Sequence, residues 1–191
     1  MVEETRGGSG KPRPRQAPRS QRPTSGPGRG RRAQPQHPSA NDDTAAPPIR
    51  SDIEPNQLAP EIRRELSTLD RATADAVARH LVAAGELIDD DPEAALSHAR
   101  AARARSGRIA AVREAVGIAA YQCGDWAQAL AELRAARRMG SKSALLPLII
   151  DCERGLGRPE RALELARGPE AAQLSGDEAD ELRIVAAGAR A

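Results

Sequence analysis

Three helix starts in this chain share one residue pattern and recur at a nearly constant interval. In each, an Ala-Leu pair follows a few residues after a turn, and the three pairs lie 34 and 33 residues apart. The pairs are Ala95-Leu96, Ala129-Leu130 and Ala162-Leu163. A period of this length, with helical sequence on both sides of each start, is typical of stacked helix-turn-helix units. We therefore expect an all-α fold.

Acidic residues mark the starts of the second helices in the first two units. Asp91 is followed by Pro92, and Asp125 follows the turn residue Gly124. A carboxylate at this position accepts hydrogen bonds from the free backbone N–H groups of the first turn, and Pro at the next position has no N–H to leave unpaired. Both acids are predicted to be helix caps.

The segment 51–69 reads as a linker that contains one short helix starting at Pro60. We expect this helix to cover the N-terminal end of the array. Ser67, with Asp70 three residues later, forms a capping-box pattern. The pattern predicts a long helix that starts there and runs to about Ile88.

These residues resemble the tetratricopeptide repeat family, in the form common in actinobacteria. The unit from 110 to 143 carries most of the family pattern, in Gly117, Tyr121, Gly124-Asp125-Trp126, Ala129-Leu130 and Ala136. The first unit departs from it at Asp90, where the turn glycine belongs. The resemblance implies an α-solenoid over 70–191 with three repeats and a terminal helix, at about 76–109, 110–143, 143–175 and 176–191.

In that family the concave surface is lined by the first helix of each repeat. The resemblance therefore implies a non-enzymatic scaffold or adaptor that holds an extended or helical protein segment in this groove. The repeat register assigns these groove candidates: His80, Leu87, Glu114, Ile118, Tyr121, Asp151 and Arg154. Each of them is equally explained as ordinary surface. The Lys and Asn positions of the chaperone-binding members are not kept, so that activity is not implied.

Residues 1–50 differ from the rest in composition. They carry nine Pro, nine Arg, one Lys and six Gly against four acids, a net charge of +6 in a chain whose total is +2. Because this segment has almost no large apolar residues, we expect a disordered tail. A basic tail supports an alternative function, a protein anchored to RNA or DNA through phosphate contacts. The tail has no aromatic residue for stacking on bases.

The sequence contains no motif of a known catalytic site, and we expect no enzyme activity, no cofactor and no metal. His80 and His98 could meet as metal ligands, but surface or partly packed histidines explain them better. Cys123 and Cys152 are expected to be reduced, packed thiols. No signal sequence or membrane-spanning stretch is evident, which favours the cytoplasm and no membrane partner.

Arginines gather near the ends of two second helices, and they are Arg100, Arg103, Arg105, Arg108, Arg134, Arg137 and Arg138. Cations are favourable at helix C-termini and usually stay solvated. A basic ridge for an acidic or nucleic-acid partner is the alternative interpretation.

A last helix is predicted from Ser175, which forms a capping box with Glu178. No partner helix follows it in the sequence. It can close the array with its polar face, or it can associate with a second copy of the chain.

Overall fold

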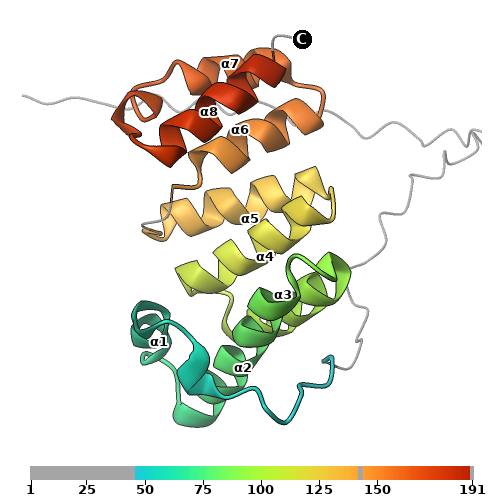
Figure 1. Ribbon diagram of the computed structural model, residues 1–191. Coiled ribbons are helices and arrows are strands. Elements are labelled where there is room, and N and C mark those ends of the chain that lie inside the picture. The colour runs from blue at the N-terminus through green and yellow to red at the C-terminus, as the bar shows by residue number, and fades with distance from the viewer. Residues whose placement is uncertain (1–45, 142–143, 190–191) are drawn as a thin grey trace, which may run out of the picture. The chain divides into compact units, whose positions relative to one another are not determined.

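The computed structural model describes residues 46–141 and 144–189, all within one compact unit from Asp43 to Ala191. The described part is all-helical and contains no strand. Its eight α-helices are α1 (Pro60–Leu66), α2 (Arg71–Leu87), α3 (Pro92–Ser106), α4 (Ala110–Gln122), α5 (Trp126–Arg138), α6 (Leu146–Gly155), α7 (Pro159–Ala166) and α8 (Asp177–Gly188) (Figure 1). Two short 3₁₀ helices complete the order, Pro55–Gln57 before α1 and Ala171–Gln173 between α7 and α8.

The expected disorder of the tail concerns residues 1–50, of which 1–45 lie outside the described residues. Residues 46–50 are described, and they form neither helix nor strand. None of the described helices is both long enough and apolar enough to cross a bilayer.

The two predicted aspartate caps are confirmed. Asp91 Oδ1 accepts the backbone N–H of Ala94 at 3.0 Å at the start of α3. Asp125 Oδ1 accepts the N–H of Gln128 at 3.0 Å at the start of α5. The two helices therefore begin in the same way, 34 residues apart.

Two other predicted caps are wrong. Ser67 ends α1, where its Oγ donates to the carbonyl of Arg64 at 2.7 Å, and the cap of α2 is Asp70. Asp70 Oδ1 accepts the Thr73 N–H at 2.9 Å, and this hydrogen bond holds the pKa of Asp70 below its usual value. The last helix begins after Gly176 without a side-chain cap, so Ser175 is not its N-cap.

Helices α4 and α6 end in the same glycine turn. Gly124, at φ 73°, donates its N–H to Tyr121 O at 2.9 Å, and the next N–H donates to Ala120 O at 2.9 Å. Gly157, at φ 72°, closes α6 with the same pair of bonds. Glycine is favoured here because other residues are strained at this positive φ. The turns send α5 and α7 back along the helices that precede them.

Consecutive helices from α2 to α7 pack against each other, and α8 packs on α6 and α7 (Figure 1). Because the connections are short, neighbouring helices run in opposite directions. The core forms three clusters along this order. Val77 and Val112 belong to the first, Leu133 and Ile149 to the central one, and Leu182 to the last.

Small residues allow the closest helix contacts. A β-carbon at Gly117 in α4 would lie 2.7 Å from Leu133 Cγ in α5. Trp126, at the start of α5, packs its indole against Gly155 in α6 and contacts the Tyr121 ring edge-on at a centroid distance of 5.3 Å. The two aromatic residues of the chain thus sit together where α4, α5 and α6 meet.

Candidate partner-binding groove

A groove of about 970 Å³ lies on one side of the unit, lined by α1, α2, α4 and the turn after α5. Its floor comes from α2 and α4. We call the lining from α1 one wall of the groove and the turn from Met139 to Ser141 the second wall. The lining residues are Leu58, Glu61, Ile62, Arg64, Glu65, Thr68, Leu81, Ala84, Gly85, Ile88, Arg108, Ile109, Ala110, Ala111, Glu114, Ala115, Ile118, Ala119, Met139, Gly140 and Ser141.

The floor is built largely from small side chains. Ala84 and Gly85 come from α2, and Ala115 and Ala119 come from α4. A β-carbon at Gly85 would have no heavy atom within 4 Å, so the space above it is open. Large apolar residues flank this floor, and one of them, Met139, is 43% exposed. The surface is apolar and hollow, as partner-binding grooves commonly are.

Helix α1 is fixed against the floor by both apolar and polar contacts. Leu66 is 2% exposed and packs with Ile62 in the N-terminal core cluster. Glu65 Oε2 accepts the backbone N–H of Ala111 at 3.2 Å, in the first turn of α4. The N-cap residue of α4, Ile109, offers no side-chain cap of its own. A carboxylate from α1 therefore caps α4, and its negative charge interacts favourably with the positive end of the α4 dipole.

Two of the sequence-predicted groove residues line this groove, and both are in α4. Ile118 is half-buried at the floor. Glu114 Oε2 accepts a hydrogen bond from Ser141 Oγ at 2.8 Å, which ties α4 to the second wall. A third predicted residue, Leu87, is half-buried at the end of α2 and packs on the central core cluster.

Three other predicted residues form a separate cluster between α4 and α6. Tyr121 Oη donates to Asp151 Oδ2 at 2.9 Å, and Arg154 Nε donates to Asp151 Oδ1 at 2.7 Å. Burial and the Asp151 carboxylate raise the pKa of Tyr121 to about 12. The same carboxylate raises the pKa of Arg154. The structure brings these three together, but outside the lining of the groove.

His80 is in a different place from the one that the repeat register predicted. It is 2% exposed and faces α3, where its Nδ1 lies 3.0 Å from His98 Nδ1. One imidazole donates and the other accepts. Burial, with repulsion from His98 and Arg105, lowers the pKa of His80 to about 4, and burial lowers that of His98. His80 therefore packs two helices together and has no surface to offer a partner.

Four of the seven arginines that could form a basic ridge are paired with carboxylates. Glu132, 4% exposed, has Arg103 Nε at 3.0 Å and Arg113 Nη1 at 2.8 Å. Glu153, 2% exposed, has Arg134 Nη2 at 2.5 Å and Arg158 Nη1 at 3.3 Å. Each buried carboxylate thus sits between two guanidinium groups from other parts of the chain. Four arginines of the ridge, Arg100, Arg103, Arg134 and Arg137, pair with acids on neighbouring elements.

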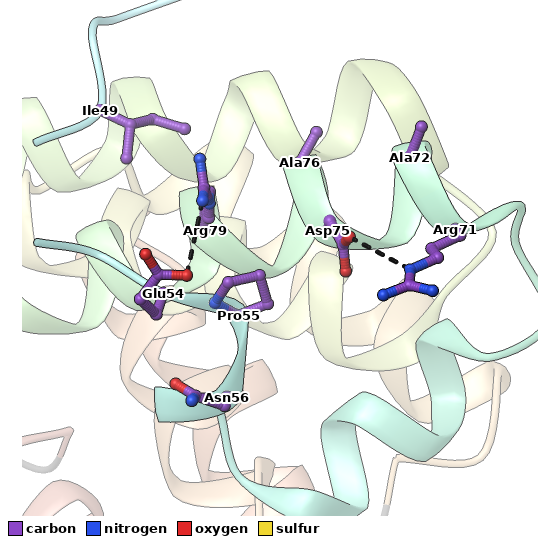
Figure 2. A pocket seen from close by; sticks show the side chains of 9 residues that line it. All are labelled: Ile49, Glu54, Pro55, Asn56, Arg71, Ala72, Asp75, Ala76 and Arg79. Carbon is purple, nitrogen blue, oxygen red and sulfur yellow. Dashed lines mark hydrogen bonds and ion pairs between the residues drawn. The ribbon is translucent and has the colours of Figure 1, made fainter. Parts of the chain in front are cut away.

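A second, smaller hollow of about 590 Å³ lies over the outer side of α2 (Figure 2). The chain around Glu54 and Pro55 crosses α2 there, and Glu54 pairs with Arg79 at 3.5 Å. Arg71 and Asp75, both on α2, lie 4.0 Å apart. These exposed pairs contribute little energy, and the hollow holds no buried polar group that would select a ligand.

Cysteine and metal chemistry are limited in the described part. Cys123 is half-buried and Cys152 is buried, and both are free thiols. Burial raises the pKa of Cys152 to about 12 and also raises that of Cys123, so neither is an activated thiolate. Within residues 46–141 and 144–189 no group of three or more His, Cys, Asp or Glu side chains is placed to hold a metal ion.

A scan against protein-family models, a search of curated proteins and a search of solved structures each found no match to this chain.

Proposed function

We propose that the chain is a non-enzymatic scaffold of the tetratricopeptide repeat type, which holds a segment of another protein in the groove formed by α1, α2 and α4. The observation that carries the proposal is the groove itself, about 970 Å³ with an Ala- and Gly-rich floor. An open apolar surface of this size on a folded unit is most often a binding surface.

Several features shared by equivalent positions support the repeat assignment. The aspartate caps of α3 and α5 and the glycine turns after α4 and α6 recur at 34 and 33 residues. Gly117 allows α4 and α5 to approach closely, which is the role of the small residue in the middle of the first helix.

The proposal differs from the prediction in where the groove lies. The repeat register spread the candidate residues from His80 to Arg154, across three units. The groove instead uses α1 as a wall and ends at the turn after α5. Ile118 and Glu114 remain candidate contact residues, whereas Tyr121, Asp151 and Arg154 bond to one another.

Quantitative affinity capture with the full chain and two variants tests this function. Gly85→Arg fills the floor of the groove, and because the space above Gly85 is open and arginine is a better helix former, the fold is expected to persist. Ser97→Arg adds the same charge at an exposed position of α3, outside the groove lining. A partner that is retained by the wild-type chain and Ser97→Arg and lost by Gly85→Arg supports the proposal. Equal capture by all three chains would overturn it.

A further inference from the structure

The groove suits a helical ligand better than an extended one. An extended peptide has unpaired backbone N–H and C=O groups along its length, and burying them against an apolar floor is costly unless they find partners. The described residues contain no strand whose edge could pair with such a backbone. A helix satisfies its own backbone groups and presents only side chains to the floor.

One helix is already seated on this surface. α1 places Ile62 and Leu66 against the core cluster to which α2 and α4 contribute, and its polar residues Glu61 and Arg64 are exposed. The groove continues this interface beyond α1, over the same two floor helices. A second helix beside α1 would therefore extend a packing that the fold already uses.

The small floor residues define what the ligand must supply. Ala84, Gly85 and Ala115 have small side chains or none, and the space above Gly85 is open, so a close fit requires large apolar side chains from the ligand. On a helix, side chains at i, i+3 or i+4 and i+7 share one face. The matching ligand carries Leu, Ile, Met or aromatic residues at that spacing.

The chain itself has no segment that fits. Residues 1–45 contain no Leu, Ile, Phe, Tyr or Trp. Among the described residues the exposed large apolar side chains are Met139 and Ile184, which come from different helices. A second copy therefore offers no exposed apolar stripe, and the ligand belongs to a different protein.

From this geometry we infer that the groove binds one amphipathic α-helix of a different protein, which packs beside α1 with its large apolar side chains over Gly85 and Ala115. The inference rests on the proposed function and names the class of its partner. It makes α1 and the turn after it a part of the binding site, in contact with the ligand through Ile62 of α1 and Thr68 of the turn.

A displayed library of random 16-residue peptides, panned against the full chain, tests this inference. Gly85→Arg and Ser97→Arg are panned in parallel, after matching thermal melts show that both variants are folded. The expected sequences share large apolar residues at i, i+3 or i+4 and i+7, with at least tenfold lower recovery on Gly85→Arg only. Proline in the middle of one synthetic hit should weaken its binding more than tenfold, because proline breaks a helix, whereas alanine at the same solvent-facing position should not.

The outcomes separate the inference from the function on which it rests. Hits with apolar residues at alternating positions, tolerant of proline and lost on Gly85→Arg, would overturn the helical ligand and leave the groove as a binding site. Hits recovered equally on all three chains would overturn both. A library that yields no enrichment would also contradict the inference.

Discussion

The indole ring of Trp126 lies against the backbone of Gly155, so that a β-carbon at position 155 would be 2.8 Å from the Cγ and Cδ2 atoms of the indole. The contact joins the first turn of α5 to the last residue of α6. It explains why a residue without a side chain stands near the end of α6.

Replacing Gly155 with alanine should destabilise the fold by about 1–3 kcal/mol, because the added methyl must displace the indole from a packed position. Chemical denaturation followed by circular dichroism measures the loss. Gly85→Ala is the matched control, since its methyl meets open space and alanine favours the helix by about 0.5–1 kcal/mol. Equal stability of the two variants would show that Trp126 does not restrict position 155.

The buried carboxylate of Glu153 should be needed for the junction between α5 and α6. Glu153→Gln leaves Arg134 and Arg158 facing each other without an anion, and we expect a loss of about 2 kcal/mol, below the value for a fully buried pair because both arginines are partly exposed. Glu164→Gln is the control, because Glu164 is 68% exposed in its pair with Arg161 and should change stability by less than about 0.5 kcal/mol. Urea denaturation distinguishes the two, and similar losses would argue against a special role for the buried site.

The His80–His98 pair should make the fold sensitive to mild acid. Both folded-state pKa values lie below the unfolded value of 6.5, so the unfolded chain binds more protons, and stability falls as the pH drops from 6.5 towards 4. Protonation of both rings would also leave two N–H groups facing each other, with the Nδ1 atoms 3.0 Å apart and no acceptor between them. Melting temperatures between pH 7 and pH 4 measure the effect. A double His80→Leu, His98→Leu variant should show a flatter profile, and an unchanged slope would mean that the pair does not cause it.

Tyr121 should ionise at unusually high pH. It is the one tyrosine in the chain, so the ultraviolet absorbance of tyrosinate reports it alone. In the folded protein the transition is expected near 12, and in urea near 10. Stability should fall as the pH rises from 10 to 12, because the unfolded tyrosine ionises first. A folded-state transition near 10 would mean that the bond to Asp151 and the burial of the ring have little effect.

Local sequence patterns were enough to predict much of the helical order. Asp91 and Asp125 were recognisable as caps because a cap acts on residues two or three positions away. The same reasoning gave the wrong cap at Ser67. This residue ends α1, and Asp70, three residues later, caps α2. A capping pattern cannot decide between two acceptors only three residues apart, because the end of the preceding helix determines which of them caps the next one.

The contacts that hold the helices in place join residues that are distant in the sequence. Glu65 caps α4 across 46 residues, and Glu132 pairs with Arg113 across 19. No local pattern records such pairs, so the bond from α1 to the start of α4 was not predicted, and the ridge arginines were expected to be solvated. His80 was misplaced for the same reason, because the packing of α3 against α2 decides whether that position is a groove or a core.

The most direct measurement of the central claim is site-specific photo-crosslinking in living cells, with a benzophenone amino acid placed in the full chain at Met139, on the groove wall, or at Ser97, on the exposed side of α3. We predict a discrete protein adduct from position 139 that disappears when Gly85→Arg is added, and no such adduct from position 97. The same adducts from both positions, or an adduct at 139 that survives Gly85→Arg, would contradict the assignment of this groove as the partner site.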